Sequence, residues 1–334
     1  MRWVNAVSDV VLVKKGSSEL PTMHAAGADQ PRPIFIIGAP RSGTSITTWA
    51  LGQHPNIQAM PETGWIASMA VGAYLSHVKG SERGRFSHLS NVEYPLGPFM
   101  ARIGESIHSI VLDAFARRCL NLYGAESLAP EWVLKGKQLE HPLQIRRSAK
   151  DPKTRWIDGT PLNTYFIWAL GELFPEALFI HNIRRPDEVA TSLEGFDRVG
   201  AEPQTLEIGL RTWIAHTENA WYAERALGAR RVFRLEFERI ARDPGRLFEE
   251  VCDFLGESFT ADCLLPLRKK LNSSEVDANR ERNLTLLREN PTFRLAEATY
   301  GAVMAQPGGE QADTEAEAVI KQRFMDYCSG RSLV

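Results

Sequence analysis

The sequence predicts an α/β protein with a three-layer parallel sheet, a P-loop-like nucleotide-binding topology and a helical insert over the site. The first observation is a short apolar strand, Ile34 to Ile37, followed by a glycine- and proline-rich loop and a helix from Thr44 to Gln53. The second is that apolar strands and helices alternate along much of the chain. This order is typical of parallel strands joined by right-handed crossovers.

Length and composition favour a globular protein that binds no nucleic acid. The chain has 334 residues, 43% of them hydrophobic, and its net charge is −2. This length suits one large α/β domain or two small ones, and the charge gives no general basic character. The cysteines share no C-x-x-C spacing, which argues against a zinc or disulfide framework and fits a reducing compartment. Without a recognisable signal peptide or membrane span, we expect a cytoplasmic protein.

We expect three regions along the chain. Residues 1–32, which include a stretch rich in Gly, Ser, Ala and Pro, form an N-terminal lead-in. Residues 33–305 form a single functional domain, with the helical insert at about 64–124. Residues 306–334 form a linker and a C-terminal helix.

The first candidate site is the loop Gly38-Ala39-Pro40-Arg41-Ser42-Gly43-Thr44-Ser45. A strand, a glycine loop and a helix N-terminus form an anion site, because loop N–H groups converge there and the helix adds about half a positive charge. The glycine spacing is that of a Walker A loop, but the lysine that reaches β/γ-phosphates is missing. Its cation has moved to Arg41, which favours a compact anion over a triphosphate with Mg²⁺. The alternative is an ordinary βα turn.

A carboxylate follows the next short strand, Ile57 to Met60. Glu62 comes directly after this strand, at the sheet edge where open α/β sheets bind ligands. A carboxylate beside an arginine-bearing anion loop suits a general base, and it equally suits an ion-pair partner or a helix cap. The residues alone leave these roles open.

A second arginine follows a buried strand from Ala177 to Ile183. Arg184 lies at the carboxyl end of this strand, and Ser192 comes eight residues later in a helix that begins at Pro186. One interpretation is a second phosphate site at the same sheet edge. The other is a surface salt bridge and an ordinary helix serine.

The remaining elements are expected as follows. Helices are expected from Gly64 to Val78 and from Pro98 to Gly124, as a wall or lid over the site. Residues 261–301 are polar and arginine-rich, so we expect either a loop-rich segment over the sheet edge or a solvated face there. The other expected strands are 156–159 and 232–237, and the other helices are 162–174, 206–227, 244–255 and 314–327.

Four stretches together resemble one family, the sulfotransferases that use 3′-phosphoadenosine 5′-phosphosulfate (PAPS). The nearest branch is that of the tyrosylprotein sulfotransferases and many bacterial enzymes. The stretches are Gly38 to Ser45, similar to the 5′-phosphosulfate loop; His54-Pro55 with Pro61-Glu62-Thr63, similar to the segment that supplies the catalytic glutamate; Ile183 to Ser192, similar to the 3′-phosphate motif; and Phe237 to Gly256, similar to the late strand and helix.

The resemblance implies transfer of a sulfuryl group from PAPS, as cosubstrate and without a metal, to a hydroxyl or amine. The acceptor is unidentified, and we expect a small molecule or natural product. The alternatives are a P-loop kinase or other NTP-dependent phosphotransferase, and a non-catalytic nucleotide-binding module. The implied catalytic residues are Glu62 and Arg41, and the implied donor-binding residues are Arg41, Ser42, Gly43, Thr44, Ser45, Arg184 and Ser192.

The chain departs from the family's pattern at three places. Members with a lysine at the loop's cation position are common, and this chain has Arg41 there, as the tyrosylprotein branch does. Many relatives have a lysine where this chain has Gly159, so a second catalytic cation is in doubt. Lys135, Lys137 and Lys153 are the candidates to replace it. Some relatives stack a tryptophan on the adenine directly after the loop, and Ile46 occupies that place here.

Overall fold

The computed structural model describes residues 30–134, 146–196, 204–268, 276–306, 309 and 312–330. Within these residues, the strands form one five-stranded sheet in the order β2-β3-β1-β4-β5. Every neighbouring pair is parallel, which confirms the predicted α/β fold. The strands are β1 (Ile34–Ile37), β2 (Ile57–Ala59), β3 (Arg155–Asp158), β4 (Leu178–Ile183) and β5 (Val232–Glu236).

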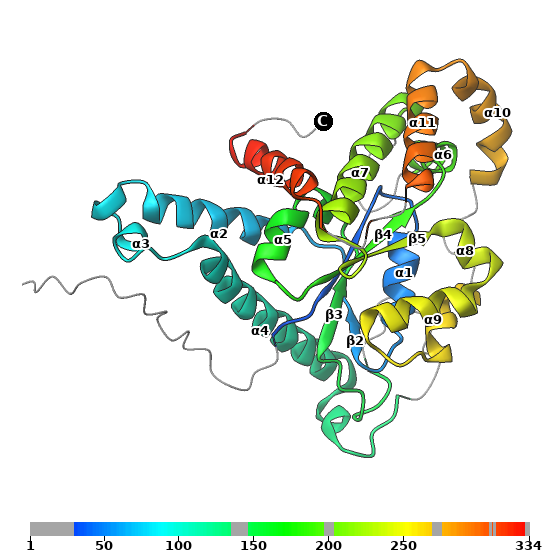
Figure 1. Cartoon of the computed structure of the whole chain (residues 1–334). Helices are drawn as coiled ribbons and strands as arrows, with labels where there is room; N and C mark the ends of the chain where they lie inside the picture. The colour runs from blue at the N-terminus through cyan, green and yellow to red at the C-terminus, as the bar shows by residue number, and fades with distance from the viewer. Residues whose placement is uncertain are drawn as a thin grey trace, which may run out of the picture.

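Helices connect and cover the strands (Figure 1). The α-helices are α1 (Thr44–Leu51), α2 (Trp65–Ser81), α3 (His88–Asn91), α4 (Leu96–Tyr123), α5 (Ile167–Leu173), α6 (Pro186–Glu194), α7 (Leu206–Leu227), α8 (Phe237–Arg242), α9 (Pro244–Leu255), α10 (Val276–Arg288), α11 (Pro291–Ala305) and α12 (Thr314–Cys328). The 3₁₀ helices are η1 (Gly84–Phe86), η2 (Ala125–Leu128), η3 (Pro161–Tyr165), η4 (Ala261–Leu264) and η5 (Pro266–Arg268).

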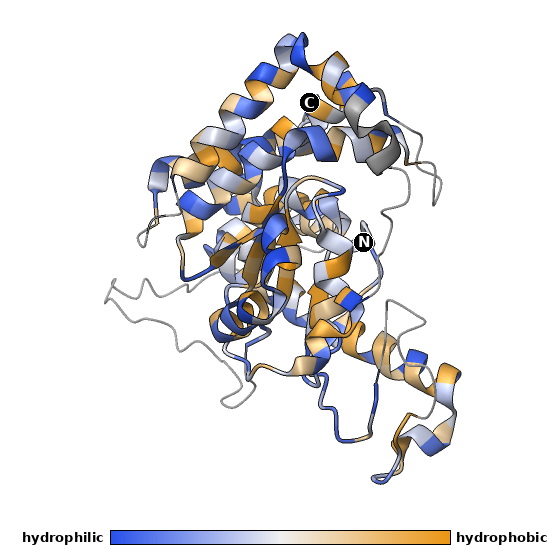
Figure 2. Ribbon diagram, turned by 90° about the vertical axis from the view of Figure 1, so that its right-hand side faces the viewer, coloured by the Kyte–Doolittle hydropathy of each residue, from blue (hydrophilic) through white to orange (hydrophobic). Residues whose placement is uncertain are grey.

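Side chains of the central strand alternate between two cores, which makes three layers. Ile34 and Ile36 belong to the core shared with α1 and α9, while Phe35 and Ile37 belong to the core shared with α2, α4, α5, α7 and α12. All four side chains are fully buried. Burial of each of these side chains contributes about 1.5–3 kcal/mol. Because they alternate between the two faces of the sheet, β1 contributes to both cores. The strands at the centre of Figure 2 are accordingly mostly orange.

The expected helical insert consists of α2, α3 and α4, which extend to one side of the sheet (Figure 1). Along α4, Met100, Ile107, Val111 and Phe115 recur at three to four or seven residues and are buried. Gly104 lies on the same face, and a Cβ there would stand 1.8 Å from the Leu173 carbonyl oxygen. The missing side chain therefore lets α4 pack directly against the end of α5.

The loop-rich segment expected at 261–301 is wrong, because α10 and α11 occupy most of it. Asn290 caps α11: its side chain accepts bonds from the amides of Thr292 and Phe293, and Pro291 opens the helix. Phe293, Ala296 and Leu287 are buried against α6 and α7. Tertiary packing thus orders a stretch whose composition is polar.

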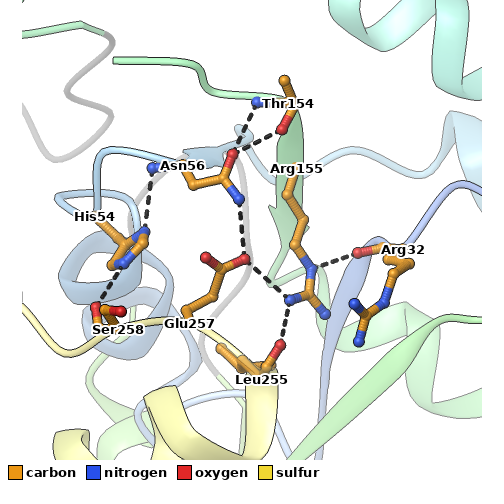
Figure 3. Close-up of polar contacts among 8 residues, drawn as sticks. All are labelled: Arg32, His54, Asn56, Thr154, Arg155, Leu255, Glu257 and Ser258. Carbon is orange, nitrogen blue, oxygen red and sulfur yellow. Dashed lines mark hydrogen bonds and ion pairs between the residues drawn. The ribbon is translucent and has the colours of Figure 1, made fainter. Parts of the chain in front are cut away.

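A polar cluster closes the amino edge of the sheet, where β2 and β3 begin (Figure 3). Arg155 donates to the carbonyls of Arg32 (2.5 Å) and Leu255 (2.7 Å), and its Nη1 lies 3.3 Å from Glu257 Oε1. Asn56 donates to the same carboxylate. We call these residues the Arg155 cluster, which consists of Arg32, His54, Asn56, Thr154, Arg155, Leu255, Glu257 and Ser258.

Candidate functional site

The loop between β1 and α1 has a backbone that suits glycine. Gly38 has φ 125° and Gly43 has φ 98°. A Cβ at Gly38 would stand 2.2 Å from the Asn182 carbonyl oxygen, and one at Gly43 would stand 2.5 Å from the Phe237 ring. Arg41 also has positive φ, 69°, which costs about 1 kcal/mol for a residue with a side chain. The two glycines are therefore fixed by close approach as well as by backbone conformation.

The start of α1 supplies donors for an anion. Thr44 and Ser45 are the first residues of the helix, so their amides have no intrahelical acceptor. Ser42 differs, because its amide and its hydroxyl both donate to the Ala39 carbonyl, at 3.2 and 2.5 Å. Among the loop residues named from the sequence, Ser42 therefore uses its amide and its hydroxyl to stabilise the turn.

Arg41 lies against the segment that carries the second predicted phosphate site. Its Nε donates to the Ser192 hydroxyl at 2.9 Å, and its guanidinium stands 4.4 Å from the centre of the Phe196 ring. Arg184 Nη1 donates to the Arg41 carbonyl at 3.2 Å. The structure therefore joins the two predicted sites directly, across 143 residues of sequence.

Arg184 is held by a carboxylate and an aromatic face. Its Nε donates to Glu188 Oε2 at 2.8 Å, and its guanidinium stands 4.2 Å from the centre of the Phe237 ring. The Trp213 indole donates to the Arg184 carbonyl at 2.9 Å, which ties the end of β4 to α7. The side chain of Arg184 remains 16% exposed, so the guanidinium is not sealed in the core.

Glu62 lies at the open side of the same loop. Its side chain is exposed, and its Oε1 accepts a 3.2 Å hydrogen bond from the Ser45 hydroxyl. Ser45 is the second residue of α1, so the carboxylate lies beside the N-terminus of that helix. The structure thus brings Glu62, the loop and the Arg184–Ser192 pair to one edge of the sheet.

A buried acid, not identified from the sequence, lies beneath this edge. Asp158 is the last residue of β3, is fully buried, and pairs in register with Phe35 of β1. Its Oδ1 accepts bonds from the amide (2.9 Å) and hydroxyl (2.5 Å) of Thr160. Burial raises the pKa of Asp158 to about 6, and the nearby Glu62 charge adds to the increase.

Thr160 links this acid to the segment that carries Glu62. Its hydroxyl oxygen accepts a 2.8 Å bond from the Thr63 amide and lies 3.2 Å from the Thr63 carbonyl oxygen. Thr63 and Thr160 are 97 residues apart in sequence. The sequence offered one signal for this acid, its position at a strand end before Gly-Thr-Pro. The contact between Thr160 and Thr63 could not be read from the sequence, because it depends on the order of the strands.

The structure explains the glycine at the position where relatives have a lysine. A Cβ at Gly159 would stand 2.1 Å from the Thr48 hydroxyl. Lys153 does not replace that lysine, because its ammonium group is buried at the amino edge, on the carbonyls of Gly52, His54 and Ile57 at 2.7–2.8 Å. Burial lowers the pKa of Lys153 to about 7. Lys135 and Lys137 lie outside the described residues.

Among the described residues, no group of three or more His, Cys, Asp and Glu side chains is arranged to hold a metal ion. Among the described helices, none combines the length and hydropathy needed to span a bilayer.

Comparison with protein-family models identifies one family. The model of the sulfotransferase family matches residues 33–261. An uncharacterized protein of Aquifex aeolicus (strain VF5) is 23% identical over 241 residues, which cover 70% of this chain and 26% of that protein. The chain therefore spans about a quarter of the length of this curated relative.

Solved structures with a similar fold include two bacterial sulfotransferases. The sulfotransferase domain of the Synechococcus PCC 7002 olefin synthase is 19% identical, with a TM-score of 0.42, over 89% of this chain and 97% of that one. A sulfotransferase from Alicyclobacillus acidocaldarius is 18% identical, with a TM-score of 0.43, over 84% of this chain and 97% of that one.

Proposed function

Since the chain belongs to the sulfotransferase family and is a transferase, we propose that it moves the sulfuryl group of PAPS to a hydroxyl or amine. The observation that carries the proposal is the contact between its two anion segments. Arg41 bonds Ser192, and Arg184 bonds the backbone of Arg41, so the two segments are in contact, which supports one ligand shared by both. PAPS has phosphate groups at both ends of its ribose, which suits a paired site of this kind.

In the proposed reaction, Arg41 and the α1 amides stabilise the leaving group. As the bond between sulfur and the bridging oxygen breaks, negative charge grows on the 5′-phosphate. The amides of Thr44 and Ser45, at the positive end of α1, and the guanidinium of Arg41 are the nearby positive groups. Such positioned donors contribute most of the catalysis in transfers of this type. The donor has no β/γ-phosphates for a metal to bridge.

Glu62 is the proposed base that removes the acceptor's proton. It is exposed, so an acceptor has access, and the Ser45 hydroxyl holds its Oε1 beside the loop that binds the leaving group. In-line transfer requires the base on the acceptor side of the sulfur, and the exposed position of Glu62 beside the start of α1 supports this role. Small-molecule hydroxyls and amines are the proposed acceptors, entering beside the start of α2.

Arg184 and Ser192 are the proposed ligands of the 3′-phosphate. The guanidinium would contribute a charge-assisted bond and the hydroxyl a neutral one. The support is that Arg184 directly follows β4, while Ser192 of α6 bonds Arg41 in the loop after β1, and that β1 and β4 are paired from Ile34 to Ile37. Among the donor-binding residues, this pair distinguishes PAPS from nucleotides that lack a 3′-phosphate.

The test compares nucleotides that differ only in the relevant groups. Titration calorimetry measures binding of 3′-phosphoadenosine 5′-phosphate (PAP), of AMP, and of ATP with Mg²⁺. We expect PAP to bind at least ten times more tightly than the other two. Labelled PAPS is then offered with phenols, alcohols and amines, and we expect labelled product from at least one class. Preference for ATP with Mg²⁺ would favour a phosphotransferase, and PAP binding without transfer would favour a non-catalytic module.

A further inference from the structure

We propose that Asp158 and Thr160 are positioning residues that hold the proposed base, Glu62, through the backbone of Thr63. The inference rests on the proposed function, because it takes Glu62 to be the base. Neither Asp158 nor Thr160 has a role as a donor ligand or a catalytic group in the proposed mechanism. They act through Thr63, whose amide nitrogen follows directly on the Glu62 carbonyl carbon.

The hydrogen count at Thr160 decides which way the chain of bonds runs. Its hydroxyl has one hydrogen and two acceptors within reach, Asp158 Oδ1 at 2.5 Å and the Thr63 carbonyl at 3.2 Å. A distance of about 2.5–2.7 Å is typical of a hydroxyl that donates to an ionised carboxylate. The hydrogen is therefore committed to Asp158. The lone pairs of the same oxygen then face the Thr63 amide, which donates at 2.8 Å.

Burial makes this arrangement rigid. Asp158 is fully buried and Thr160 is 8% exposed, so water does not compete for their bonds. Asn163 also acts on the carboxyl and opposes the rise in its pKa, although no hydrogen bond of good geometry joins the two side chains. Glu62 is the ionisable group that acts on Asp158 from the neighbouring loop. The carboxylate is thus costly to bury and has Thr160 as its hydrogen-bonding partner among the described residues.

Glu62 is held from two sides in consequence. The Ser45 hydroxyl bonds its carboxylate at 3.2 Å, and Thr160 fixes the peptide unit directly after it. Catalytic groups need to be held within about 0.5 Å of the productive position. An exposed carboxylate on a loop does not meet this requirement by itself. The buried acid supplies the anchor that the loop lacks.

The first experiment compares Thr160→Val, Thr160→Ser and the matched control Thr154→Val. Thr154 also bonds through its hydroxyl, to Asn56 at 2.7 Å, but at the amino edge of the sheet. With PAPS and 2-naphthol, we expect Thr160→Val to lower kcat at least tenfold with the Kd of PAP unchanged within threefold. Thr160→Ser should restore most of kcat, and Thr154→Val should leave it unchanged. Wild-type kcat in Thr160→Val would overturn the proposal, as would equal losses in kcat and PAP binding.

The pH profile separates positioning from simple folding. When the Asp158 carboxylate is protonated, Thr160 is released to donate to the Thr63 carbonyl, and the loop shifts. The acid limb of the wild-type kcat profile should therefore lie near pH 6. In Asp158→Asn we expect a lower kcat at neutral pH and an acid limb moved to lower pH. An acid limb that stays in place would overturn the role of Asp158.

A third readout does not depend on activity. Hydrogen exchange, followed by NMR at pH 7, reports the Thr63 amide of the full chain without ligand. We expect Thr160→Val to speed exchange at Thr63 at least tenfold, and Thr154→Val to leave it unchanged. If the wild-type protein transfers no sulfuryl group but shows this exchange pattern, the proposed function fails while the Asp158–Thr160–Thr63 link stands. If the Thr63 amide exchanges equally fast in the wild-type protein and in Thr160→Val, the link between Thr160 and Thr63 itself fails.

Discussion

Arginines lie at both edges of the sheet, and the arginines at one edge contact different groups from those at the other. At the amino edge, Arg155 is 6% exposed and bonds two backbone carbonyls and a carboxylate (Figure 3). At the carboxyl edge, Arg41 and Arg184 contact a serine hydroxyl, one carbonyl, one carboxylate and two aromatic faces. Both edges thus use backbone carbonyls and a carboxylate as acceptors. The carboxyl edge differs because it adds a serine hydroxyl and two aromatic faces, which are uncharged partners.

The largest expected effect concerns the proposed base at the carboxyl edge. Glu62→Gln keeps the size and the Ser45 contact but removes proton acceptance. General bases contribute about 10²–10⁴-fold, so we expect turnover of 2-naphthol with PAPS to fall by at least about 100-fold. The Kd of PAP should change less than threefold. Glu82→Gln, an exposed glutamate bonded to Lys79, is the matched control. Retained turnover in Glu62→Gln would remove the base from the mechanism.

The second effect is on stability and belongs to the amino edge. Arg155→Met keeps volume but leaves Glu257, 14% exposed, without its cation. Loss of one partner of a buried pair typically costs about 3–5 kcal/mol, so the free energy of unfolding in urea should fall by about that amount. PAP affinity of the folded protein should be unchanged. A fall in PAP affinity without a change in stability would contradict the division between the edges.

The third effect is a pH dependence of stability caused by Asp158. Its pKa is raised from 3.8 to about 6, so the folded protein holds this proton more tightly than the unfolded chain. Stability from this group is present at low pH and lost as pH rises toward and past 6. Between pH 4 and 7.5, the unfolding free energy should fall by up to about 3 kcal/mol relative to Asp158→Asn. Parallel denaturation curves for the two proteins across this range would contradict the pKa shift.

The smallest effect concerns the 3′-phosphate ligand. Arg184→Ala removes one charge-assisted bond, which contributes about 1.5–3 kcal/mol, so PAP should bind about 10–100 times more weakly by calorimetry. AMP binding should hardly change. Arg246→Ala is the matched control, because Arg246 bonds Glu250 at the same i,i+4 spacing as Arg184 and Glu188. Equal losses for PAP and AMP would place Arg184 elsewhere in the site.

Much of the fold was predictable because its strands are short apolar runs between clear turn signals. The helix from 206 to 227 and the helix from Pro244 to Leu255 have the bounds expected from their periodicity and from Gly256. The segment after 261 was not predictable from composition. Its helix α11 depends on Asn290 as a cap and on apolar residues buried against α7, whose spacing is sparse within a polar stretch.

The candidate site, like the fold, was predictable from the sequence only in part. Glycine spacing and arginines at strand ends predicted which segments share one edge, because parallel strands bring their carboxyl ends together. The roles of Glu62, Arg41, Arg184 and Ser192 stay predictions. The link from Asp158 through Thr160 to Thr63 was hidden, since it depends on β3 lying between β1 and β2. No local pattern specifies that order.

The close contact at Gly159 also makes two sequence positions epistatic. A side chain there would meet the Thr48 hydroxyl at 2.1 Å, while the Thr48 Cβ would stand 3.3 Å away. A side chain at 159 therefore requires the Thr48 hydroxyl to move, and alanine at 48 removes that contact while leaving a Cβ 3.3 Å away. A design that introduces a side chain at 159 has to treat residue 48 together with it.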